Sequence, residues 1–155
     1  MRYRLKDIDF STIKYNLGIS NDYGKLLNLN ESLEFQTPKI FIDTILSENG
    51  KGYLILKIHS NEACKTFCSK IFEFEKTLPG VISIFDGSYF KVKIPFTNGN
   101  PQIKVFCGDN FFNYYNLKKG MEVICLVSIS KIWKSVDTTT NYYLNVKEIL
   151  VTKQI

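Results

Sequence analysis

Short runs in which apolar and polar side chains alternate follow one another between residues 81 and 133, and they limit the chain to a mainly β fold. The clearest run spans residues 81–95 and contains Asp86-Gly87, a dipeptide suited to a type I′ hairpin turn. Side chains in a strand alternate between its two faces. The second half of the run therefore presents an apolar face of Phe90, Val92 and Ile94, predicted to be core, and an outward face of Tyr89, Lys91 and Lys93.

The length of 155 residues predicts one main domain, residues 37–155, preceded by an extension of residues 1–36. The extension is polar and rich in asparagine, and two interpretations stay open: a hairpin added to the fold, or a partly ordered arm. The chain has no apolar run near the roughly 20 residues that span a bilayer, and its first ten residues lack the apolar core of a secretory signal. A cytoplasmic protein without membrane contact is expected.

Within the main domain, turn residues separate several predicted strands and two predicted helices. Asn61 is expected to cap a helix over residues 62–78 that Pro79-Gly80 ends, and a second, short helix is expected over residues 111–117. The predicted strands cover residues 39–46, 53–59, 81–95, 102–106, 121–133 and 142–152.

Metal and catalytic sites find little support among the residue types present. A zinc site made of His59, Cys64, Cys68 and Cys107 would match no standard ligand spacing, and Cys125 sits among aliphatic residues as a small buried side chain. The chain has one histidine and no glycine-rich phosphate loop. The sequence therefore predicts a protein that is not an enzyme and that has no cofactor and no metal site.

The net charge of +5 comes almost entirely from lysine, since arginine is nearly absent after Arg4. Lysine suits sequence-independent contact with phosphates, whereas arginine dominates the reading of base edges. The charge therefore favours binding to a nucleic-acid backbone. The competing interpretation is that a modest positive charge serves solubility alone.

The second half of the chain has the order strand, short helix, Leu117-x-x-Gly120-x-x-Val123 turn, long strand, loop and final strand. This order resembles the second half of the oligonucleotide/oligosaccharide-binding (OB) fold. The expected fold is thus mainly β, a five-stranded OB-like antiparallel barrel with one or two short helices and the N-terminal extension.

Residues 81–152 further resemble the OB-fold single-stranded DNA-binding proteins of cytoplasmic linear plasmids and large DNA viruses. Two segments carry this resemblance, residues 127–133 (VSISKIW) and residues 142–149 (YYLNVKEI), and the abundance of Asn, Ile and Lys fits an AT-rich genome. The resemblance implies a role in DNA replication, with single-stranded DNA and replication proteins as partners.

Binding single strands without sequence preference requires a cationic track and exposed rings on which bases stack. Trp133 has two interpretations, a core residue at one end of the barrel or a stacking platform beside the 135–141 loop. Tyr142 and Tyr143 must point to opposite faces. The predicted nucleic-acid-binding residues are Tyr53, Lys57, Tyr89, Lys91, Lys93, Lys104, Phe106, Lys131, Trp133, Lys134, Tyr143 and Lys147.

Alternatives of another class stay open at this point. Tyrosine and lysine are common on exposed antiparallel strands that bind nothing. An OB-like module could instead scaffold a replication or transcription complex through residues 1–36 and the helix over residues 62–78. RNA would suit the same outward face as DNA, and a homo-oligomer is compatible with the sequence.

Overall fold

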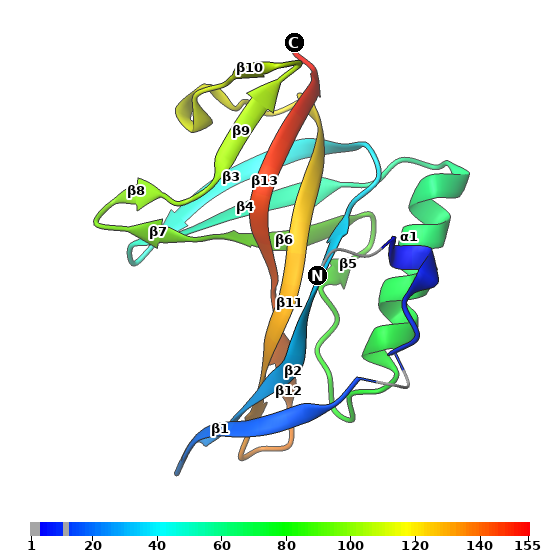
Figure 1. Ribbon diagram of the computed structural model, residues 1–155, viewed down its shortest axis with the longest axis vertical. Helices are drawn as coiled ribbons and strands as arrows, with labels where there is room; N and C mark the ends of the chain where they lie inside the picture. Colours follow the sequence, from blue (N-terminus) through cyan, green and yellow to red (C-terminus); the bar gives the residue numbers. More distant parts are fainter. Residues whose placement is uncertain (1–3, 11–12) are drawn as a thin grey trace.

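The computed structural model describes residues 4–10 and 13–155, and its centre is a closed ring of five paired strands (Figure 1). Around the ring the order is β3 (Ile40–Glu48), β4 (Lys51–Lys57), β6 (Tyr89–Ile94), β13 (Leu144–Lys153) and β11 (Glu122–Ser135). Pairing of β11 with β3 closes the ring. Every pair in the ring is antiparallel except β6 with β13, which is parallel. The predicted mainly β, OB-like fold is confirmed.

A second group of strands extends the sheet beyond the ring, at the bottom of Figure 1. β2 (Gly24–Gln36) pairs with nearly the whole length of β11, and β1 (Tyr15–Asn21) pairs with β2 as a hairpin. β12 (Thr140–Tyr142) pairs with β11 along the edge of β11 that does not pair with β2. We call β1, β2, β12 and residues 131–135 the arm. Residues 1–3, 11 and 12 of the predicted extension lie outside the described residues.

The remaining strands are short. β5 (Phe85–Asp86) pairs with β6, and β7 (Phe96–Thr97) pairs with β8 (Asn100–Pro101) in a separate two-stranded sheet. β9 (Lys104–Cys107) runs parallel to β13 and pairs with β10 (Asn110–Phe111), near the C-terminus in Figure 1. Within the described residues, single turns of 3₁₀ helix lie at η1 (Leu5–Asp7) and η3 (Tyr114–Asn116).

The helix α1 (Glu62–Glu75) confirms the prediction made from its cap and its apolar spacing. The side chain of Asn61 accepts a hydrogen bond from the backbone N–H of Cys64 at 2.9 Å, which satisfies a free donor of the first turn. Phe67, Ile71 and Phe74 lie on one side of the helix and are buried in the core. The helix ends three residues before the predicted Leu78.

Three local predictions are wrong. Within the predicted strand of residues 81–85, residues 81–84 make one isolated bridge only, from Val81 to Thr140. The hairpin loop is Gly87-Ser88 rather than Asp86-Gly87, and only Gly87 has a positive φ, of 61°, which is the pattern of a type II′ turn. The second predicted helix shrinks to η3, which Asn113 caps.

Candidate nucleic-acid interface

The outward side of β4 and β6, the second and third strands of the ring in chain order, brings aromatic and lysine side chains together. Tyr53 lies opposite Lys93, and Lys57 lies opposite Tyr89. On the neighbouring strands, Tyr143 lies between β12 and β13, and Lys131 and Trp133 lie on β11. We define the aromatic–lysine face as Tyr53, Lys91, Lys93, Lys131, Trp133 and Tyr143.

Each lysine of β6 on this face lies over a tyrosine ring. The Nζ atom of Lys91 is 4.1 Å from the ring centroid of Tyr53, and that of Lys93 is 5.4 Å from the centroid of Tyr143. The two rings are themselves neighbours, with centroids 6.2 Å apart and an angle of 41° between their planes. These distances are those of cation–π contacts. A third such pair, Lys57 over Tyr89 at 5.8 Å, lies at the other end of the two strands.

The two tyrosines at the centre of the face differ in accessibility. Tyr143 is 43% exposed, whereas Tyr53 is only 7% exposed. Burial raises the pKa of Tyr53, and the neighbouring Tyr143 and Glu48 raise it further. Tyr143 is therefore the more accessible of the two rings, although a lysine lies over each of them.

Positive charge gathers around Lys93. Its pKa is lowered from the ordinary value by partial burial and, further, by the nearby charges of Lys51 and Lys131. Lys51 was not among the predicted site residues, because it precedes the predicted strand of residues 53–59. It begins β4 two residues before Tyr53, so the period-two alternation could have found it. An anion would relieve the repulsion among these three ammonium groups.

Trp133 lies on the sheet surface, half-buried, and is not among the buried core residues. Ile132 pairs with Tyr142, and both are buried, so the residues on either side of them face outward. Trp133 consequently shares its face with Lys131 and Tyr143. The prediction that Tyr142 and Tyr143 point to opposite faces is confirmed.

Besides Lys57 and Tyr89, which lie at the other end of β4 and β6, four predicted residues lie outside this face. Lys134 lies on the opposite side of the arm from Trp133, paired with Lys25. Lys104 and Phe106 belong to β9, and Lys147 lies at a bulge of β13. Lys104 and Lys147 line a shallow cavity of about 450 Å³ together with Glu34, Pro101, Gln102, Ile103, Leu126 and Glu148.

Phe106 packs against an aromatic side chain, that of Phe111, rather than in the core enclosed by the five strands. Its centroid is 5.2 Å from that of Phe111, with the planes 30° apart, and Phe111 is 80% exposed. The sequence predicts Phe111 in a helix over residues 111–117, whereas the structure has it in β10. Across β9 and β13, Lys104 lies opposite Glu148, whose negative charge offsets the positive charge of the lysine.

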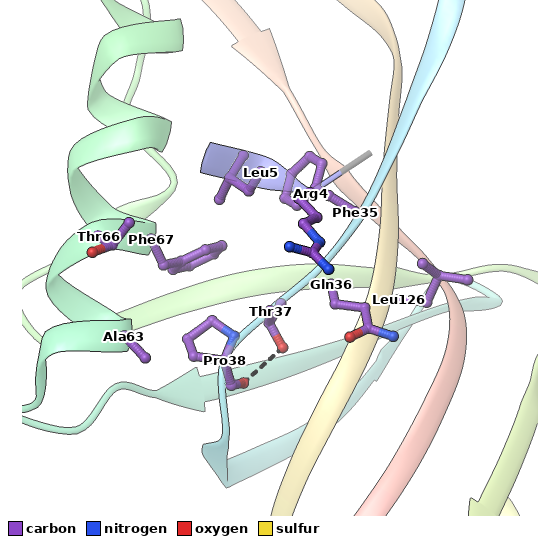
Figure 2. A pocket seen from close by; sticks show the side chains of 10 residues that line it. All are labelled: Arg4, Leu5, Phe35, Gln36, Thr37, Pro38, Ala63, Thr66, Phe67 and Leu126. Carbon is purple, nitrogen blue, oxygen red and sulfur yellow. Dashed lines mark hydrogen bonds between the residues drawn. The ribbon is translucent and has the colours of Figure 1, made fainter. Parts of the chain in front are cut away.

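Another cavity, of about 630 Å³, lies between α1, the segment of Arg4 and Leu5, and the end of β2 (Figure 2). The side chains of Arg4 and Gln36 both line it. None of its described lining residues is a carboxylate or a histidine. It shares no described residue with the aromatic–lysine face, and its side chains offer no acid–base pair.

Across residues 4–10 and 13–155, no group of three or more His, Cys, Asp or Glu side chains is placed to hold a metal ion. His59 instead packs on Phe41, with ring centroids 4.0 Å apart, and lies 3.8 Å from a carboxylate oxygen of Glu122. Within the same described residues, no helix combines the length and apolarity needed to cross a membrane.

No family model matches the sequence, and no curated protein matches it. Among solved structures, the crystal structure of gp2.5, a single-stranded DNA-binding protein encoded by bacteriophage T7, has a similar fold, with a TM-score of 0.61. The match covers 81% of this chain and 88% of that chain at 11% sequence identity. At this identity the likeness concerns the fold, and it agrees with the OB-like ring.

Proposed function

We propose that this chain is a sequence-independent single-stranded DNA-binding protein that protects replication intermediates. The observation that carries the proposal is the aromatic–lysine face, which includes Tyr53, Lys91 and Lys93 on the second and third strands of the ring. The outward side of these two strands and the loops beside it are where OB folds bind single strands. The similarity in fold to a phage single-stranded DNA-binding protein supports it.

The geometry suggests separate roles for the tyrosines and the lysines of this face. In the free protein, Lys91 and Lys93 lie over the rings of Tyr53 and Tyr143. A base that stacks on either ring must occupy the position of the lysine side chain that lies over that ring. The phosphate of the same nucleotide then requires a cation nearby. Binding would therefore exchange lysine–ring contacts for base–ring and lysine–phosphate contacts. Because Tyr143 is the more exposed ring, it would take the first base.

Tyr143→Ala is expected to weaken binding to a thymidine oligomer by about 1–3 kcal/mol, the usual contribution of one base–aromatic stack. Filter binding at constant salt measures this change. Tyr115→Ala is the matched control, since Tyr115 is 64% exposed but lies on η3, away from the face. Equal losses in the two variants, or no loss in Tyr143→Ala, would place the interface elsewhere. A uridine oligomer in the same assay assigns DNA or RNA as the preferred ligand.

A further inference from the structure

We infer that the β1–β2 hairpin is a second part of the interface, and that nucleotides beyond those at Tyr143 and Trp133 cross its outer face. This inference rests on the proposed function. It concerns residues that no sequence motif singled out, namely Asn16, Gly18, Leu26 and Asn28.

The register of the arm places these residues beside the aromatic–lysine face. Across β2 and β11, Leu26 lies opposite Trp133, and Asn28 lies opposite Lys131. Across β1 and β2, Asn16 lies opposite Asn28. Residues directly opposite each other in a sheet share a face, so the surface of Lys131 and Trp133 continues over two more strands. At about 4.8 Å per strand, Asn16 lies roughly 10 Å from Lys131, within reach of the same bound chain.

The shape of this continuation suits a ligand that lies flat. Gly18 is on the same side, and a Cβ atom there would be 2.7 Å from the side-chain nitrogen of Asn28 and 3.3 Å from the carbonyl oxygen of Leu26. Any larger residue at Gly18 would thus crowd the two neighbours. With glycine there, a half-buried Leu26 beside Trp133 forms an apolar floor, and Asn16 and Asn28 add amides that can donate to and accept from base edges.

The charges on the hairpin are compatible with a bound phosphate chain. Asn16, Gly18, Leu26 and Asn28 are uncharged, so a phosphate chain leaving Lys131 meets no repulsion from them. Toward β9, the lining of the shallow cavity contains Glu34 and Glu148 together with Lys104 and Lys147. A polyanion that is held at Lys93 and Lys131 passes two carboxylates in that direction, whereas the four hairpin residues place no carboxylate beside it.

The test adds a charge to either side of the same strand. Asn16→Lys places a cation on the proposed track. Ser20→Lys places one on the other side of β1, where Ser20 lies opposite Lys25. Both positions are exposed, so both variants should fold. Affinity for oligothymidylates of about 4 and about 16 nucleotides, which span the site sizes of OB folds, is measured as a function of salt.

Asn16→Lys is expected to bind the longer oligomer several-fold more tightly than the unchanged protein, with a salt slope steeper by about 0.7 for one added phosphate contact. Ser20→Lys should leave both quantities unchanged, and Asn28→Asp should weaken binding of the longer oligomer. If the unchanged protein binds both oligomers but the two lysine variants behave alike, the hairpin is not part of the interface. If the unchanged protein binds neither oligomer, the proposed function itself fails.

Discussion

Glu75→Ala is expected to lower the free energy of unfolding by about 2–5 kcal/mol, because it leaves the buried hydroxyl of Tyr142 and the partly buried backbone N–H of Ile84 without their acceptor. The same carboxylate oxygen of Glu75 accepts two hydrogen bonds. One comes from the hydroxyl of Tyr142 at 2.5 Å, and the other comes from the backbone N–H of Ile84 at 3.0 Å. Glu75 is 5% exposed and Tyr142 is 4% exposed. Burial raises the pKa of Tyr142, and the bond to Glu75 raises it further, so the tyrosine stays a donor at neutral pH.

Urea denaturation measures the effect of Glu75→Ala, and Glu73→Ala is the matched control. Glu73 lies two residues earlier on α1, half-exposed, and makes a surface ion pair with Lys70 at 3.3 Å, so its loss should cost less than about 1 kcal/mol. Glu75→Gln keeps an oxygen acceptor in place and should fall between the two. A Glu75→Ala protein as stable as the Glu73→Ala protein would show that the buried carboxylate does not hold α1 to β12.

The double variant Lys91→Ala/Lys93→Ala is expected to bind a thymidine oligomer roughly tenfold more weakly, from two surface phosphate contacts of about 0.7 kcal/mol each. Its salt slope should be shallower by about 1.4, or 0.7 per lost contact. Both changes follow from removing the cations that lie over the tyrosine rings.

Lys25→Ala/Lys134→Ala is the control for this double variant. It also removes two positive charges, and these two lysines lie opposite each other on the other side of the arm. It should therefore show the effect of net charge alone. The account fails if both double variants lose the same affinity and the same salt slope, since binding would then depend on overall charge and not on the face.

The sequence alone predicted those features that depend on neighbours along the chain. Alternation placed Phe90, Val92 and Ile94 in the core, and the spacing after Asn61 predicted α1, as the structure confirms. The boundaries were less accurate where a tertiary contact decides them. Residues 81–84 have the pattern of a strand, but the backbone N–H of Ile84 binds Glu75 instead of a neighbouring strand.

Contacts between distant segments were beyond prediction from the sequence. Lys104 and Phe106 show the same alternation of a lysine and an aromatic residue as Tyr89 and Lys91. β9 nevertheless pairs with the C-terminal half of β13, whereas β6 pairs with β4. No local pattern indicates which strands become neighbours. The partners Glu75 and Tyr142 are 67 positions apart, and only the fold brings them together. Alternation alone could have separated Lys134 from Trp133.

Binding of single-stranded DNA to the aromatic–lysine face can be followed by the fluorescence of Trp133, the single tryptophan, during titration with a thymidine oligomer and with a duplex of the same length. Trp133 lies on the aromatic–lysine face, so the account predicts quenching by the single strand at low salt, with weaker binding as salt rises. The duplex should quench little, because its bases are already stacked. Equal quenching by the duplex, or no response to the single strand together with no mobility shift, would contradict it.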